Sequence, residues 1–151
     1  MTTENISNEN LIEDLNDIIV KNYDAAKGFK NASTNIELQE LKEVFLKCSI
    51  QRNKFAGELQ QEIRNLGGEP KHESSAISAM HRAWMDVKSA VSSDEEEAIL
   101  GACVTGEEAA VKEYDELIDQ NIPSNIKEII QVQRNIVNDT LQSIKILRAA
   151  A

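Results

Sequence analysis

Apolar residues recur at steps of three and four positions along almost the whole chain, and this period restricts the chain to helices that bury one face. The alternating pattern of a half-buried strand is not found in the sequence. Long apolar stripes of this kind cover about residues 9–32, 38–66, 100–117 and 126–147. We expect each of them to form an amphipathic helix with its apolar face in a common core.

Residues that interrupt the stripes predict where the helices end. The stretch "NASTN" follows the first stripe, and Thr34 and Glu37 have the spacing of a capping box for the second helix. The stretch "LGGEP" follows the second stripe. There, Gly67 or Gly68 can adopt the left-handed conformation of a helix C-cap, and Pro70 prevents the helix from continuing.

The lengths of the connections predict how the helices are arranged. Short turns join the first helix to the second and the third to the fourth, so each pair should form an antiparallel hairpin. A short amphipathic helix is expected at residues 75–91, inside a connection long enough to run the length of the bundle. This pattern predicts an all-α, ferritin-like four-helix bundle, with two antiparallel hairpins joined by a long crossover that contains a short helix. A single domain over residues 1–151 is expected.

The composition restricts the partners and the location of the protein. The chain of 151 residues has 26 acidic residues against 16 lysines and arginines, a formal charge of -10. This charge repels phosphate groups, so neither nucleic acid nor an anionic membrane is expected as a partner. The N-terminal stretch "MTTENISNEN" lacks the features of a signal peptide and no apolar run is long enough to span a bilayer, so we expect a cytoplasmic protein. Cys48 and Cys103 are expected to be reduced, buried thiols.

Each long stripe also carries one polar residue near the middle of its apolar side. These residues are Asn22, Arg52, Glu107 and Gln133, and their distances from the two turns place them at about the same height in a bundle of hairpins. A buried Glu107 is costly by itself, but Arg52 can neutralise it, and the two amides can supply hydrogen bonds. The alternative is that Arg52 reaches solvent past the edge of its hairpin.

Ferritin-like bundles build a di-metal site at this level, from a Glu on each of two helices and Glu-x-x-His on each of the other two. Here the second helix has Arg52 and Phe55 in place of that Glu and His, and the fourth helix has no histidine. The histidines of the chain are His72, after the glycine pair, and His81, in the short helix. We therefore predict no catalytic, cofactor-binding or metal-binding residues, and we interpret the four polar residues as the layer left by a vestigial site.

A shifted metal site remains open as an alternative. It would use Asp24, Glu107 and Glu108, with iron or manganese as the metal. Catalytic arrangements of Ser, His and Asp or of Cys and His, phosphate-binding loops and CxxC pairs are not visible in the sequence, which argues against an enzyme.

Five stretches, "SIQRNKFAGEL", "LGGEP", "HRAWMDVKSA", "GEEAAVKEY" and "IKILRA", follow one another through all but the first helix. With these stretches the chain resembles a bacterial ferritin-like family of four-helix-bundle proteins of about this length, described as a domain of unknown function. The resemblance implies the ferritin-like fold and no known enzyme activity. Relatives often carry an acidic "DGE-x-GF"-like stretch where this chain has "DAAKGF" at residues 24–29, and often a histidine near the position of Leu141. Both differences remove polar groups from the layer.

These observations favour a non-enzymatic cytoplasmic protein that acts by self-association or by binding a partner, with a stress-associated role implied by the resemblance alone. The alternative is a di-iron or di-manganese protein that handles peroxide or stores iron. Trp84 and Met85 are adjacent in the short helix and cannot both point into one groove. One of them is therefore available for a subunit contact, and we expect a homodimer.

Overall fold

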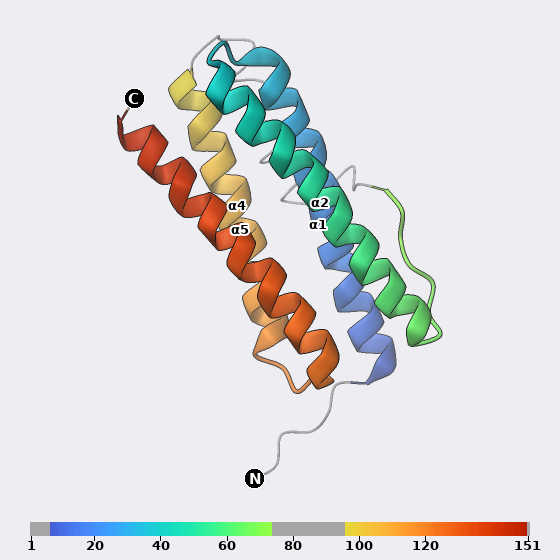
Figure 1. Cartoon of the computed structure of the whole chain (residues 1–151). Helices are drawn as coiled ribbons and strands as arrows, with labels where there is room; N and C mark the ends of the chain where they lie inside the picture. The colour runs from blue at the N-terminus through green and yellow to red at the C-terminus, as the bar shows by residue number, and fades with distance from the viewer. Residues whose placement is uncertain (1–6, 74–95, 151) are drawn as a thin grey trace.

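The computed structural model describes residues 7–73 and 96–150, and these residues form four long helices. The helices are α1 (Asn8–Asn35), α2 (Gln39–Asn65), α4 (Glu96–Ile118) and α5 (Ser124–Ala150). α1 and α2 form one antiparallel hairpin and α4 and α5 form the other, as Figure 1 shows. The prediction of an all-helical chain built from two hairpins is confirmed. The short helix expected at residues 75–91, with Trp84 and Met85, lies outside the described residues.

The direction of the helices confirms the long connection between the hairpins. α1 and α5 run in one direction and α2 and α4 in the other, so α2 ends at the end of the bundle opposite to the start of α4 (Figure 1). Residues 66–95 must therefore lead from one end of the bundle to the other. An up-down-up-down bundle, in which each helix is antiparallel to the one before it, would need only a short loop between α2 and α4.

The first part of this connection turns back along α1 and α2 and is held there by two side-chain amides. Asn16 of α1 donates a hydrogen bond from Nδ2 to the carbonyl of Glu69, at 3.1 Å, and accepts one from the amide of Lys71, at 2.8 Å. Gln60 of α2 donates from Nε2 to the carbonyl of Lys71, at 2.8 Å. Both amide side chains are buried. They therefore supply hydrogen-bond partners to the carbonyls of Glu69 and Lys71 and to the amide of Lys71, in place of water.

The end of α1 differs from the prediction. The stretch "NASTN" does not interrupt the helix, which continues to Asn35. Ser33, Thr34 and Asn35 donate side-chain hydrogen bonds back to the carbonyls of Lys30 and Asn31 in the same helix, so their polar groups bond within the helix rather than ending it.

The predicted capping box at the start of α2 is therefore wrong. Thr34 belongs to α1 and donates its hydroxyl hydrogen to a carbonyl of that helix. α2 begins at Gln39 after Leu38, which has no side-chain cap.

The end of α2 agrees with the prediction and identifies the glycine that makes the turn. Gly67 has a φ of 81°, in the left-handed region, and its amide donates to the carbonyl of Arg64 at 2.9 Å. The amide of Gly68 donates to the carbonyl of Ile63, also at 2.9 Å. This pair of hydrogen bonds is a Schellman motif. At Gly68 a Cβ would lie 2.7 Å from Cδ1 of Ile12, so the isoleucine side chain would have to shift to admit it.

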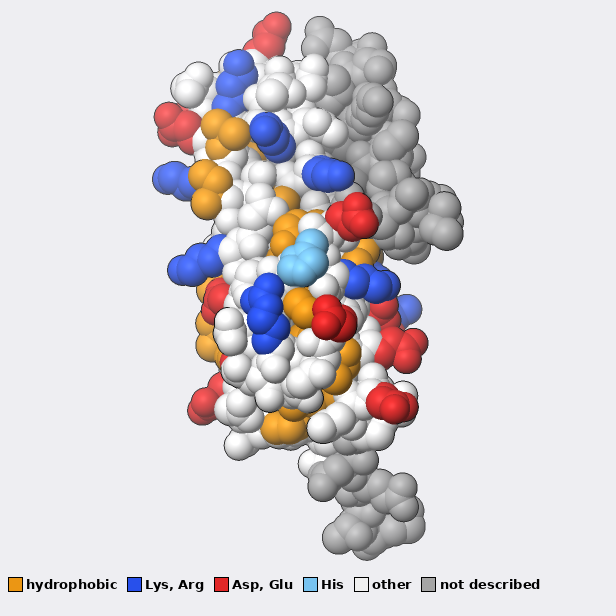
Figure 2. All heavy atoms as spheres, turned by 90° about the vertical axis from the view of Figure 1, so that its right-hand side faces the viewer, with side chains coloured by type: hydrophobic (Ala, Val, Ile, Leu, Met, Phe, Trp, Pro, Cys, Tyr) orange, Lys and Arg blue, Asp and Glu red, His pale blue; other side chains and the backbone are white. Residues whose placement is uncertain are grey.

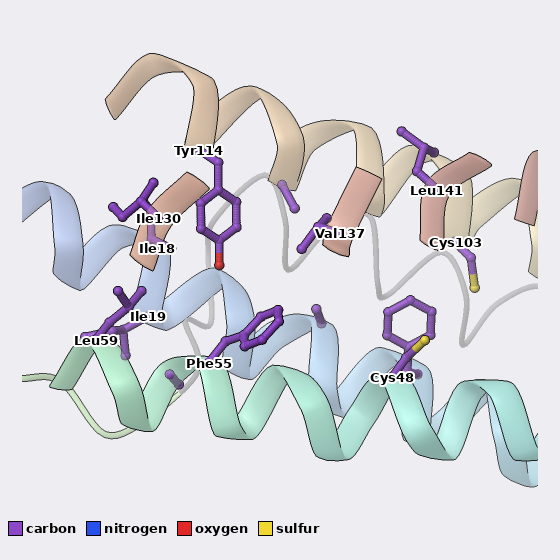
Figure 3. Close-up of a cluster of buried hydrophobic side chains, with 14 of the residues drawn as sticks. Ile18, Ile19, Cys48, Phe55, Leu59, Cys103, Tyr114, Ile130, Val137 and Leu141 are labelled. Atoms are coloured by element: carbon purple, nitrogen blue, oxygen red, sulfur yellow. The ribbon is translucent and has the colours of Figure 1, made fainter. Parts of the chain in front are cut away.

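The apolar stripes of the four helices meet in one core, part of which is shown in Figure 3. Phe29 of α1 and Phe45 of α2 pack with their ring centroids 5.7 Å apart, and both side chains are fully buried. Ile36, in the turn between α1 and α2, is also buried and closes that end of the core. Among the helices that the model describes, none combines the length and apolar character that crossing a membrane requires.

We predict opposite effects for two glycine substitutions in and after α2. Gly67→Ala should lower the free energy of unfolding by about 1 kcal/mol, because a Cβ is disfavoured at positive φ. Gly57→Ala should raise it by about 0.5–1 kcal/mol, because Gly57 is a helical residue and its Cβ would meet no atom within 4 Å. Urea denaturation of both variants measures these changes, and equal effects would contradict the left-handed turn.

Candidate functional site

The centre of the bundle contains a fully buried ion pair between α2 and α4. Arg52 and Glu107 both have side chains with 0% exposure. Nη1 of Arg52 donates to Oε1 of Glu107 at 2.5 Å, and Nη2 donates to Oε2 at 2.6 Å. Two parallel hydrogen bonds of this kind form the strongest geometry available to a guanidinium and a carboxylate. The alternative in which Arg52 reaches solvent is wrong, because its side chain is enclosed on every side.

The guanidinium also lies over an aromatic ring of α1. Its central carbon lies 5.4 Å from the centroid of the Phe29 ring, where the face of the ring attracts a cation. Nε of Arg52 is buried and has no hydrogen-bond partner in the described part of the chain. The ion pair therefore retains one unsatisfied donor, which weakens its net contribution to stability.

A narrow crevice between α1 and α4 reaches the ion pair but cannot admit a ligand. It is lined by Asn22, Arg52 and Tyr114, with Lys21 and Glu113 among its other lining residues, and it has no room for a water molecule. Nζ of Lys21 lies 3.6 Å from Oε1 of Glu113, which links the two helices beside the crevice. Burial raises the pKa of Glu113, and the charge of Lys21 opposes that rise.

The charge states near the layer follow from burial and from the ion pair. Burial opposes the charge on Arg52, but the charge and hydrogen bonds of Glu107 outweigh it and raise the pKa of the guanidinium above its ordinary value. Burial also raises the pKa of the Cys48 thiol to about 11 and that of Cys103 well above its ordinary value. Both thiols are free and stay protonated at neutral pH, so they are poor nucleophiles and poor metal ligands.

A second set of buried polar groups is centred on Tyr114 of α4, whose hydroxyl points into the core in Figure 3. Asn22 of α1 donates from Nδ2 to the Tyr114 hydroxyl at 3.0 Å, and the hydroxyl donates to Oε1 of Gln133 on α5 at 2.7 Å. Nε2 of Gln133 donates to the carbonyl of Phe55 on α2, at 3.3 Å. The chain of hydrogen bonds thus touches all four described helices.

The structure buries all four residues of the predicted layer but arranges them as two groups. Arg52 and Glu107 are in direct contact, whereas Asn22 and Gln133 meet through Tyr114. Asn22 donates to this tyrosine and to a main-chain carbonyl, whereas Gln133 accepts from the tyrosine and donates to a main-chain carbonyl, and none of these hydrogen bonds involves the ion pair.

The part that Tyr114 plays was not predicted from the sequence. A signal was present, since Tyr114 lies two turns after Glu107 on the same stripe, and a buried tyrosine needs a partner for its hydroxyl. Burial raises the pKa of Tyr114, while the hydrogen bond from Asn22 and the charge of Arg52 oppose that rise.

The side chains of the described residues do not form a di-metal centre. Both oxygens of Glu107 are occupied by Arg52, so this carboxylate is neutralised by a cation of the protein itself. In residues 7–73 and 96–150, no three His, Cys, Asp or Glu side chains gather as a metal site would require. The shifted site is therefore wrong. Asp24 and Glu107 are buried whereas Glu108 is exposed, and the three do not form such a group. His72 lies in the connection after α2, and His81 is outside the described residues.

Comparison with known proteins identifies a family for most of the chain. Residues 10–120 match the family model described as "Domain of unknown function (DUF2383)". The match begins in α1, includes α2 and α4, and stops before α5. No curated protein matches the chain.

We predict strong coupling between the two charges of the ion pair. Arg52→Leu alone should cost roughly 3–5 kcal/mol of stability, because Glu107 would remain buried without a partner, and Glu107→Leu should be costly for the same reason. The double variant with both leucines should recover much of the loss, since apolar replacement of a buried pair is often neutral. A double-mutant cycle by urea denaturation measures the coupling. A coupling energy near zero would mean that the interaction between Arg52 and Glu107 adds nothing to the free energy of unfolding.

We also predict that Tyr114→Phe destabilises the protein by about 1–3 kcal/mol, because Oε1 of Gln133 would lose its buried donor. Tyr23→Phe is the matched control. The Tyr23 hydroxyl accepts from Gln60, which also donates to Lys71, so its loss should cost less than about 1 kcal/mol. Thermal and urea unfolding of the two variants give the comparison, and an equal cost would show that the hydrogen-bond chain has no special role.

Proposed function

The chain belongs to the DUF2383 family, and on this premise we propose that it is a ferritin-like bundle in which a buried ion pair stands where such bundles hold two metal ions. In this proposal the protein is not an enzyme. It acts through its outer surface, by self-association or by binding another protein. A stress-associated role is carried over from the family resemblance alone.

The observation that carries this proposal is the position and charge of Arg52. A di-iron or di-manganese centre needs several carboxylates, because their negative charges must offset those of the metal ions. Here the buried carboxylate Glu107 is already offset by a guanidinium that binds both of its oxygens. A metal ion at this level would meet a fixed positive charge rather than a set of free ligands.

The other groups of the layer support a structural use of the site. The crevice that reaches Arg52 has no room for water, and therefore none for a substrate. The hydrogen-bond chain through Tyr114 links the four described helices to one another. Such a chain favours one arrangement of the helices, which is what a protein that presents a surface requires.

The alternative, a di-iron or di-manganese protein that handles peroxide or stores iron, would need the ion pair to open and further ligands to arrive. Among the described residues Asp24 is the other buried acid, and it does not form a ligand group with Glu107. No observation in the described part of the chain favours this alternative.

We predict that protein purified without chelators contains well under one iron or manganese per chain and oxidises Fe(II) no faster than buffer does. The physical reason is that Arg52 occupies the carboxylate on which a metal would depend. Elemental analysis and an Fe(II) oxidation assay test this, with Glu107→Ala as the control variant. Stoichiometric metal that disappears in Glu107→Ala would contradict the proposal, whereas metal that persists in it would be bound elsewhere on the surface.

A further inference from the structure

A hollow between α1 and α2, which we call the α1–α2 hollow, has several hydrogen-bond donors around it. Its volume is about 320 Å³, at the lower end of the range for pockets that hold small molecules. The polar and charged residues of its walls are Tyr23, Lys27 and Lys30 of α1, Asn53 of α2, and His72 and Glu73 of the connection after α2. Neither Arg52 nor Glu107 lines it, so the hollow is separate from the polar layer.

The spacing of residues along α1 brings the donors of this helix to one hollow. Tyr23, Lys27 and Lys30 follow one another at steps of four and three positions, so they lie on one side of the helix. Ala26 and Ser49, which also line the hollow, are buried and form its base. The Ser49 hydroxyl donates to the carbonyl of Ala26 at 2.7 Å. This hydrogen bond joins α1 to α2 at the base and holds the two walls in place.

One buried amide orients two of the donors. Nε2 of Gln60 donates to the Tyr23 hydroxyl at 2.7 Å and lies 3.2 Å from Nδ1 of His72, and its two hydrogens also serve the carbonyl of Lys71. Because Nε2 of Gln60 offers only hydrogens, Nδ1 of His72 meets it as an acceptor, and the imidazole carries its hydrogen on its own Nε2. The Tyr23 hydroxyl accepts from Gln60 and retains its own hydrogen to donate. Both side chains therefore keep a donor for another group.

The charges of the walls favour an anion. Two lysines line the hollow against one acid, Glu73, although the whole chain has a net charge of -10. Lys30 forms no ion pair with any residue in the described part of the chain. Charges farther away than about 8–10 Å are largely screened by salt, so the lysines in the walls act on a ligand more strongly than distant acids do. Figure 2 shows a face on which basic and acidic side chains lie around a histidine.

We propose that the α1–α2 hollow binds a small organic anion through a phosphate or carboxylate group. Lys27 and Lys30 offset the charge of that group, and Tyr23 and His72 donate hydrogen bonds to its oxygens. A metal cation would be repelled by the two ammonium groups, and the overall charge of the protein repels a polyanion such as nucleic acid. The inference goes beyond the proposed function and does not depend on it, because the hollow contains neither residue of the buried ion pair.

The first test is an NMR titration of the isotope-labelled full-length protein with inorganic phosphate and, separately, with succinate, at constant pH and ionic strength. At least one probe should give saturable shifts of amide signals from residues that line the hollow, with a Kd in the millimolar range or below. The probe that binds more tightly identifies the anionic group that the hollow prefers. Sodium chloride at matched ionic strength is the control for general effects of salt.

The second test compares variants that change one charge or one donor. Lys30→Gln should raise the Kd about three- to tenfold, because it removes a cation from the walls. Tyr23→Phe should also raise the Kd, since the donor hydroxyl is lost. Glu73→Gln should lower the Kd, because it removes the acid that lines the hollow. Lys47→Gln is the matched control. Lys47 is exposed on α2 but does not line the hollow, so the same loss of charge there should leave the Kd unaltered.

Three results would overturn the inference. They are the absence of saturable shifts with both probes, an equal rise in Kd for Lys30→Gln and Lys47→Gln, and a Kd that Glu73→Gln does not lower. The second result would show only a general attraction of anions to surface lysines. Lys30, Lys47 and Glu73 are exposed, so these variants should fold, and circular dichroism verifies this. None of these results bears on the metal content of the protein, which tests the proposed function separately.

Discussion

The ion pair between Arg52 and Glu107 sets the condition that the rest of the bundle must meet. Transferring two charges out of water costs several kcal/mol for each ion, and only a well-aligned partner offsets that cost. The partners come from different hairpins, Arg52 from α2 and Glu107 from α4. The hairpins must therefore pack at the height and rotation that bring these two side chains together. A shift of one helical turn, about 5.4 Å, would leave both charges buried and unpaired. The pair thus fixes how the hairpins are aligned, whereas apolar packing alone would tolerate more than one alignment.

The hydrogen-bond chain through Tyr114 adds a second constraint next to the first. Its groups are uncharged, and their hydrogen bonds connect all four described helices, whereas the hydrogen bonds of the ion pair join α2 and α4. A buried amide without a partner is costly, so each helix must present its polar residue at the right rotation. Together the two sets of contacts specify how the helices are aligned in the middle of the bundle. The apolar stripes above and below supply most of the buried apolar area that stabilises the fold.

The sequence predicted the helices, their pairing and the four layer residues because all of these depend on periodicity and on the lengths of connections. Other features depend on the hydrogen bonds that particular side chains make, and the period of the apolar residues does not predict these bonds. Ser, Thr and Asn at the end of α1 can either stop a helix or donate hydrogen bonds to carbonyls within it, and here they do the latter. Tyr114 fits an apolar stripe whether or not its hydroxyl is used. The contact of Asn16 with the main chain of Glu69 and Lys71 has no sequence signature at all, because main-chain groups are the same at every residue.

The hydrogen bonds that Asn16 and Gln60 make with the segment after α2 lie within the hairpin of α1 and α2. Because these residues are synthesised first, this half of the protein can take shape on the ribosome before α4 and α5 exist. During that interval Arg52 is a bare cation in the middle of the newly formed apolar face. An apolar surface of another nascent chain could cover that face only by burying the charge unpaired. The face therefore accepts a partner at low cost only when that partner brings a carboxylate to meet Arg52, as α4 does with Glu107.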